Sequence, residues 1–350
     1  MPSLKLQFSK WTLNGFLGIL LLYLMVLATG VGAVHIPASD VLSIILHNIG
    51  LSASSSFTEL HESIVLNLRL PRVMLATLVG ATLAVSGAAL QGLFRNPLAE
   101  PGLIGVSSGA AIGVCAGILT EPYWQSWGSE ILLSVLLPLF AFVGAIVAVY
   151  VVYAIANRSA APSVATMLLC GIAITALAQA GIGFFSFIST EAQLRNMNMW
   201  LFGSLAGASW DILAIIAPIA IISVVVILFQ YRPLNALLLG ERQAGHLGVN
   251  VDRFKRVLFI SVAAGVGACV SISGIIGFVG LIVPHLLRLT IGSDHRYLLT
   301  GSALMGGVLL LGADILARIT VTPAELPVGI VTAMVGVPFF LWLIVRNHSY

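Results

Sequence analysis

Few side chains in this 350-residue chain have the types and spacing that chemistry requires. The seven histidines are scattered, and no two of them show metal-ligand spacing on one face of a predicted helix. The three cysteines, Cys115, Cys170 and Cys269, lie inside apolar runs, and their odd number argues against a disulfide framework. No G-x-x-x-x-G-K-[ST] phosphate-binding motif occurs. We therefore predict no catalytic residue, no metal site and no nucleotide site, and we do not expect an enzyme.

The charged residues that stand out are arginines at the edges of apolar runs. Arg69 and Arg72 open one run, and Arg318 closes another. They are either snorkelling residues that anchor helix ends or a cationic patch that receives carboxylates from another protein. Asp314 and Glu325 flank Arg318 and are expected to pair with it, because an unpaired charge near the bilayer is costly. A proton relay is the alternative role for these two acids.

The apolar segments that must position these residues make up almost the whole chain. Hydrophobic residues account for 59% of it and charged residues for 8%, whereas a soluble domain carries roughly 25% charged residues. A bilayer span needs about 20 mainly apolar residues. We predict an all-α integral membrane protein, one transmembrane domain over residues 1–350, with spans at about 12–34, 64–92, 103–120, 131–156, 164–188, 211–230, 256–274, 277–291, 298–316 and 327–346. The first run is too long for the h-region of a signal peptide and is read as a span.

The distribution of basic residues predicts the orientation. With ten spans both termini lie on one side, and that side carries twelve Lys and Arg residues. Only four lie on the other side, namely Arg69, Arg72, Arg195 and Arg318. Because basic loops stay in the cytoplasm, we expect both termini to be cytoplasmic.

The sequence also contains a weak candidate for an internal repeat. Ser86-Gly87 precedes Pro97 by the same spacing as Ser273-Gly274 precedes Pro284. The two stretches belong to spans that run in opposite directions, as inverted repeats of transporters do. Coincidence in a Gly-rich chain is the alternative.

Four ordered motifs resemble those of FecCD-type permeases, which serve binding-protein-dependent ABC importers of siderophore-bound iron, haem and cobalamin. The motifs are RLPRVMLATLVGATLAVSGAALQGLFRNPLAEPGLIGVSSGAA from Arg69, LLGERQAGHLGVNVDRFKRV (238–257), GFVGLIVPHLLRLTIGSDHR (277–296) and GADILARITVTPAELPVGIVTAMVGVPFFLWL (312–343). The resemblance implies a type II ABC importer fold of ten helices in two inverted halves. It also implies a homodimer in a bacterial inner membrane, two cytoplasmic ABC ATPase subunits and a periplasmic substrate-binding protein, with no nucleic acid partner.

The resemblance also assigns roles to two groups of residues. Arg69, Arg72 and Arg318 match the arginines that receive acidic residues of the binding protein. The cytoplasmic segment 232–256 matches the coupling segment that contacts the ATPase, with a predicted helix over 238–247. An ordinary amphipathic surface helix is the alternative. The expected coupling residues are Leu238, Gly240, Glu241, Arg242, Ala244, Leu247 and Gly248.

The cargo pathway is expected along span 164–188 and the loop after it. Flexible thioethers and aromatic rings in that loop suit a broad apolar ligand, although a Met and Trp belt at the membrane interface is the alternative. If haem is the cargo, Arg195 is expected to meet its propionates at the mouth of the pathway. The expected pathway residues are Gln179, Phe184, Arg195, Met197, Met199 and Trp200. The amino-acid sequence of the loop resembles that of haem permeases more than that of cobalamin permeases. Haem is therefore the expected cargo, a ferric siderophore is the second candidate and cobalamin the third.

Two other classes of function fit the sequence less well. A secondary transporter needs ionisable groups near the bilayer centre, and the predicted spans are nearly free of charge. A membrane enzyme needs converging acids, histidines or nucleophiles at one depth, and none is evident in the sequence. The sequence therefore favours a permease without a permanent cofactor, with ATP bound only by a partner subunit.

Overall fold

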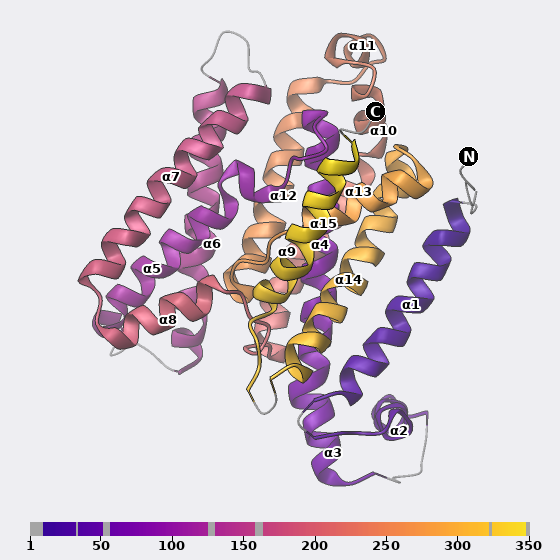
Figure 1. Cartoon of the computed structure of the whole chain (residues 1–350), viewed down its shortest axis with the longest axis vertical. Helices are drawn as coiled ribbons and strands as arrows, with labels where there is room; N and C mark the ends of the chain where they lie inside the picture. Colours follow the sequence, from indigo (N-terminus) through magenta and orange to yellow (C-terminus); the bar gives the residue numbers. More distant parts are fainter. Residues whose placement is uncertain are drawn as a thin grey trace.

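The computed structural model describes residues 10–32, 34–51, 57–124, 130–157, 164–321 and 324–347, and all regular elements in these ranges are helices (Figure 1). In chain order they are α1 (Lys10–Gly30), α2 (Ala38–Asn48), α3 (Glu59–Ser63), the π-helix η1 (Ile64–Arg69), α4 (Leu70–Phe94), the 3-10 helix η2 (Pro101–Ile104), α5 (Val106–Trp124), α6 (Glu130–Asn157), α7 (Val164–Ile188), α8 (Glu191–Leu201), α9 (Trp210–Phe229), α10 (Tyr231–Leu237), α11 (Glu241–His246), α12 (Val251–Ser273), α13 (Val279–Ile291), α14 (His295–Ile319) and α15 (Val328–Asn347). The predicted all-α class is confirmed.

A helix lies over each of the ten ranges predicted as spans. In the described part of the chain, seven helical segments are long and apolar enough to cross a membrane. The helices α5, α13 and α15 are not among these seven, and their crossing of the bilayer stays a prediction. With 13 residues, α13 is about 20 Å long, shorter than the roughly 30 Å hydrocarbon layer. It begins after Phe278, which has a φ of +68°, so the chain enters this helix through an irregular segment.

The helix α4 forms the centre of the bundle and packs against α9, α12, α13 and α14 (Figure 1). In an apolar stretch of 18 residues within the span that contains α4, 78% of the residues are buried, compared with 28% in the corresponding stretch of the peripheral α9. Small residues permit this close packing. A Cβ atom at Gly80 would lie 2.2 Å from the carbonyl oxygen of Gly306, and one at Gly87 would lie 1.9 Å from that of Gly280. The backbones of α14 and α13 therefore contact α4 directly.

A second group, α5, α6 and α7, packs beside this bundle, with α8 below it in the view of Figure 1. Glycines again bring the backbones together, because a Cβ at Gly113 would lie 2.2 Å from the carbonyl oxygen of Phe140 on α6. The segment 191–201, expected as a loop, is the helix α8, and Thr190 and Gln193 form a capping box at its start.

The two ends of the molecule differ in what they carry. Helix α1 begins and α15 ends at the end where α10 and α11 lie, and α2, α3 and α8 lie toward the opposite end (Figure 1). We call these the α11 end and the α3 end. Helices α4 and α12 run in opposite directions between them. The two stretches of the candidate repeat do not occupy equivalent positions in their helices, because Ser86 and Gly87 lie inside α4 whereas Gly274 terminates α12.

Candidate functional site

The segment at the α11 end is two short helices joined by a sharp turn. The sequence predicted one helix over 238–247, and this prediction is wrong for its first turn. Gly240 has a φ of +113°, a conformation that favours glycine, so α10 ends at Leu237 and α11 starts at Glu241. The turn leaves Leu238 and Leu239 partly exposed, 41% and 64%. Two leucines beside a charged helix form an amphipathic surface outside the bundle.

The helix α11 is fixed to α12 by a buried residue and an ion pair. Ala244 is fully buried in the main apolar core, so it seats the helix rather than presenting a surface. The Glu241 carboxylate lies 2.8 Å from Lys255 Nζ. The exposed residues of the predicted coupling set are then Arg242, Leu247 and Gly248, together with Leu238 and the half-exposed carboxylate of Glu241.

The helix α10 is tied to α14 through Asn235. Its side-chain amide donates to Asp294 Oδ1 at 2.8 Å, and its oxygen accepts from the backbone N–H of His295 at 2.9 Å. The same oxygen lies 2.8 Å from His295 Nδ1. His295 is fully buried and packs against Gly92 of α4, where a Cβ would lie 2.4 Å from its Nε2. Asn235 therefore links α10 to α14, and through the buried His295 ring to α4.

The charge of Asp294 is maintained by this arrangement. Partial burial would raise the pKa of its carboxyl, but hydrogen bonds from Asn235 and from the backbone N–H of Arg296 outweigh it, and the pKa lies below its ordinary value. Asp294 is thus ionised at neutral pH and accepts the bond from Asn235 as a carboxylate. Sequence reasoning missed Asn235, Asp294 and His295. A signal was available in Asp294, an N-cap residue before an apolar run.

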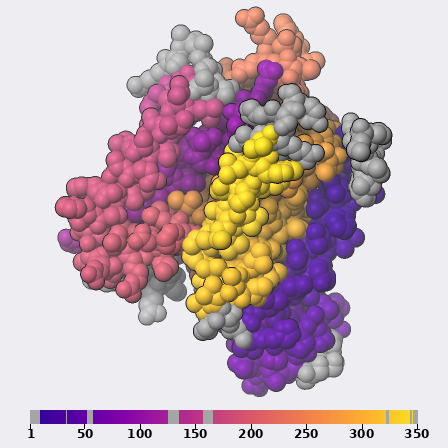
Figure 2. All heavy atoms as spheres, in the orientation of Figure 1, coloured from indigo at the N-terminus to yellow at the C-terminus, as the bar shows by residue number. Residues whose placement is uncertain are grey.

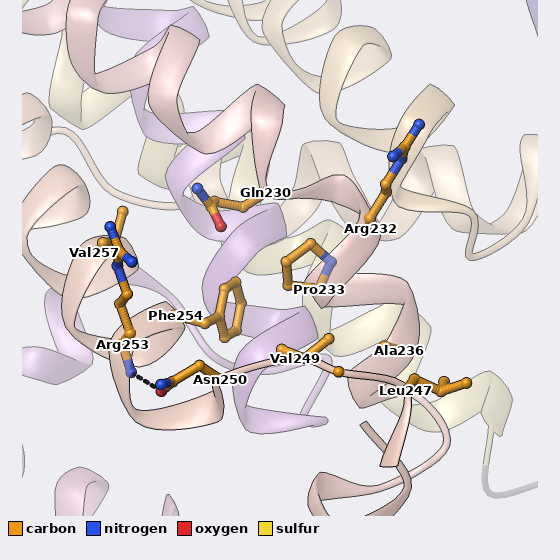
Figure 3. Close-up of a pocket in the computed structure, with 11 residues that line it drawn as sticks. Gln230, Arg232, Pro233, Ala236, Leu247, Val249, Asn250, Arg253, Phe254 and Val257 are labelled. Atoms are coloured by element: carbon orange, nitrogen blue, oxygen red, sulfur yellow. Dashed lines mark hydrogen bonds between the residues drawn. The ribbon is translucent and has the colours of Figure 1, made fainter. Parts of the chain in front are cut away.

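A hollow of about 600 Å³ opens between α10 and the start of α12 (Figure 3). Pro233 and Phe254 form apolar parts of its wall, and the side chains of Arg232 and Arg253 extend from its two sides. No carboxylate is among its described lining residues. Asn250 caps α12 at the edge of the hollow by accepting from the backbone N–H of Arg253 at 3.0 Å. The hollow suits an apolar side chain of another protein with an acidic group beside it.

At the α3 end, Arg69 and Arg318 bind the free carbonyls at the end of α1. Arg69 donates to the carbonyl oxygens of Thr29 at 2.9 Å and Gly30 at 2.8 Å, and Arg318 to those of Ala28 at 2.9 Å and Val31 at 2.8 Å. The last carbonyls of a helix lack partners within the helix, so the two guanidinium groups serve as its C-terminal cap. Both side chains are buried within the chain.

Arg72 lies between two carboxylates. Its guanidinium is 2.8 Å from Asp314 Oδ1 and 2.7 Å from Glu325 Oε2. Asp314 is fully buried and lies 2.9 Å from Arg318 as well, so its predicted pairing with Arg318 is confirmed. The same prediction for Glu325 is wrong, because this residue pairs with Arg72. Of the three arginines, Arg72 is the one whose counter-ion, Glu325, is itself 42% exposed.

The predicted pathway residues lie on α7 and α8. Gln179 and Phe184 are on the exposed face of α7, where Phe187 is 87% exposed. Arg195 and Met199 are exposed on α8, and Trp200 is half-buried. Met197 does not share this surface, because it is 1% exposed and packs in the core. In Figure 2, α7 and α8 (pink) lie on the left of the visible face, α15 (yellow) crosses its middle and α1 (indigo) lies on the right, with atoms of other helices set deeper between α7 and α15.

The FecCD transport family matches residues 20–346 of the chain, nearly its whole length. The chain belongs to this family.

Relatives and a solved structure agree with this assignment of a FecCD permease. The hemin transport system permease protein of Yersinia pestis is 44% identical over 338 residues, which cover 95% of this chain and 96% of that protein. The cobalamin import system permease protein of Halobacterium salinarum (strain ATCC 700922 / JCM 11081 / NRC-1) is 46% identical over 286 residues, 82% of this chain and 74% of that protein. A solved inward-facing conformation of a metal-chelate type ABC transporter superposes with a TM-score of 0.81 at 29% identity, covering 96% of this chain and 99% of that one.

The FecCD permease is therefore the transmembrane subunit of an ABC importer, and ATP hydrolysis belongs to a separate subunit. Its apolar helices place it in the inner membrane as a multi-pass protein.

Proposed function

We propose that this permease carries haem from the periplasm to the cytoplasm by alternating access, as a homodimer driven by two ATPase subunits and supplied by a binding protein. The observation that carries the choice of haem is the 44% identity to a hemin permease over nearly the full length of both chains. Cobalamin is the second candidate, because a cobalamin permease is 46% identical over a shorter region. A ferric siderophore is the third, supported by the fold of the metal-chelate transporter.

The exposed face of α7 and the helix α8 would line the cargo pathway between two copies. Phe184 and Phe187 offer flat apolar surface, and Met199 on α8 adds a flexible thioether. Haem is a broad apolar plane with two carboxylates, so it needs a cation beside such a surface. Arg195 is exposed on α8 and supplies that charge. Gln179 and Trp200 flank the same route, whereas Met197 supports α8 from within.

The ATPase subunit would dock on the α10–α11 segment. Leu238, Arg242, Leu247 and Gly248 offer a mixed apolar and cationic surface, and the hollow between α10 and α12 lies beside it. Glu241 and Ala244 hold α11 on the bundle, and Gly240 sets the turn between the two helices. Motion of the ATPase would pass from α10 through Asn235 to Asp294 and His295, and so to α14.

The binding protein would dock at the α3 end, with Arg72 as the receiving cation. Glu325 already forms an ion pair with this guanidinium, so a carboxylate of the binding protein would replace Glu325 in that pair. Arg69 and Arg318 would contribute positive charge to the site while they hold the end of α1. Such pairs set orientation and association rate and weaken with salt.

The α11 end is proposed to be cytoplasmic, with both termini on that side. The support is the bias of Lys and Arg toward this side of the spans and the presence there of the segment proposed to meet the ATPase.

A competition experiment tests the cargo. Proteoliposomes containing the permease and its ATPase receive binding protein together with equal concentrations of haem, cobalamin and a ferric siderophore, and the cargo taken up with ATP is measured. We expect haem to enter and Arg195→Ala to reduce its uptake several-fold, while Asn196→Ala on the same helix leaves it unchanged. Preferential uptake of cobalamin or the siderophore would replace haem as the proposed cargo, and unchanged uptake by Arg195→Ala would remove the propionate contact.

A further inference from the structure

A narrow apolar groove separates α6 from α12 near the α11 end. Farther along, the two helices pack closely, because a Cβ at Gly267 would lie 3.3 Å from the Cβ of Ala145. Toward the α11 end this contact is replaced by a groove of about 290 Å³. Phe259 and Ala263 form its buried floor, while Tyr150 and Ile260 on its walls are 69% and 68% exposed. The groove therefore opens on the outer surface of two helices assigned to the membrane.

The polarity of the groove changes along the membrane normal. Arg256 contributes the one charge among its described lining residues, and it lies in the second turn of α12. The lining residue farthest from it on α12 is Ala264, about 12 Å along the helix at roughly 1.5 Å per residue. This length approaches one leaflet, about half of the roughly 30 Å hydrocarbon layer. A charged end at the interface and an apolar interior match the two parts of a phospholipid.

The guanidinium of Arg256 lacks a carboxylate partner among the described residues. Its recorded hydrogen bond is a long one, from Nε to the carbonyl oxygen of Asp252 at 3.5 Å. The neighbouring Lys255 by contrast pairs with Glu241. Arg253, three residues earlier and so on the same side of α12, is exposed and forms no ion pair in the described part of the chain, and the carboxylate of Asp252 pairs with neither arginine. Arg256 thus lies without a carboxylate partner at the interface end of an apolar groove, whereas Arg253 lines the hollow between α10 and α12.

We propose that this groove binds an anionic phospholipid, with one acyl chain between α6 and α12 and the phosphate on Arg256. A phosphate oxygen satisfies an arginine strongly because both partners are charged, and basic pockets at the cytoplasmic ends of membrane helices favour such headgroups. A free phosphate offers the same headgroup chemistry but leaves the apolar interior of the groove empty. The proposal rests on the membrane assignment of α6 and α12 and is independent of the cargo.

Native mass spectrometry of the full-length permease complex tests the site. The complex is titrated with phosphatidylglycerol and with phosphatidylcholine of the same acyl chains. We expect preferential retention of phosphatidylglycerol and a loss of about tenfold in its affinity in Arg256→Gln. The matched control is Arg296→Gln, because Arg296 lies at the same end but stacks on Trp11. In Ala264→Phe, which fills the groove, we expect weaker binding of both lipids with an unchanged unfolding temperature.

Several results would overturn the proposal. Equal binding of phosphatidylglycerol by Arg256→Gln and by the parent complex removes the headgroup site, and unaltered binding by Ala264→Phe removes the acyl-chain site. Displacement of phosphatidylglycerol by millimolar inorganic phosphate, with no effect of Ala264→Phe, identifies a free-anion site instead. Release of the lipid from the isolated permease when the ATPase is added identifies Arg256 as part of the ATPase contact instead.

Discussion

Replacement of Asn235 by alanine is expected to uncouple ATP hydrolysis from transport. The change removes three contacts of 2.8 to 2.9 Å, to Asp294, to the backbone N–H of His295 and to its Nδ1. A hydrogen bond contributes about 0.5–1.5 kcal/mol, and one to a charged group about 1.5–3 kcal/mol. Because Asp294 is only partly buried, its bond is discounted, and the combined loss is about 2–4 kcal/mol at the junction of α10 with α14. A loss of this size would weaken the junction that we propose carries the movement of α10 to α14.

The assay measures haem uptake and ATP hydrolysis in the same proteoliposomes, and its readout is the ratio of the two. We expect Asn235→Ala to keep most of the hydrolysis and to lower the ratio by tenfold or more. Asn48→Ala is the control, because Asn48 makes one exposed side-chain bond, to Glu62 at 3.2 Å, at the opposite end. A correctly inserted Asn235→Ala complex with the parental ratio would refute the proposed route through α10 and α14.

Three further results are expected. Glu325→Gln should speed association of the binding protein several-fold at low salt, because Arg72 loses one of its internal counter-ions. An unchanged association rate in stopped-flow measurements would count against Arg72 as the receiving cation. Gly87→Leu should prevent accumulation of folded permease, because the leucine Cβ alone would lie 1.9 Å from the carbonyl oxygen of Gly280. A normal yield in size-exclusion chromatography, with normal thermal stability, would contradict the packing of α4 on α13. Since the pKa of Asp294 is lowered on folding, its contribution to stability is complete above the ordinary aspartate value of about 3.9 and is lost as the pH falls through the lower folded value. Asp294 should therefore stay ionised between pH 5 and 8, and its titration should not change the ratio of uptake to hydrolysis in this range. An Asp294→Asn variant whose deficit in this ratio disappeared within the range would contradict the assignment of Asp294 as a carboxylate.

The helices could be predicted from the sequence because the bilayer requirement acts locally. A run such as 211–230 is apolar apart from Asp211, Ser223 and Gln230, and the structure places α9 over Trp210–Phe229. The turn at Gly240 was missed because the residue pattern around it does not reveal the backbone conformation. Leu238–Leu247 has a helix-like pattern, and only the positive φ of Gly240 shows that the helix breaks there.

The partners of the charged residues could not be predicted, because they are remote in sequence. Arg72 and Asp314 are 242 positions apart, and Asn235 and Asp294 are 59 apart. Which arginines cap α1 and which one pairs with an exposed acid depends on how α1, α4 and α14 pack. The burial of Met197 is likewise set by the angle at which α8 lies on the bundle, and its spacing from Arg195 and Met199 does not reveal it.

Uptake of haem under two energy sources tests the central claim most directly. The permease is reconstituted with its ATPase and loaded binding protein, and separately alone in liposomes under an imposed proton or sodium gradient. We expect uptake in the first system with ATP, its loss when the phosphate-binding lysine of the ATPase is replaced, and none in the second. Gradient-driven uptake by the permease alone would contradict the account.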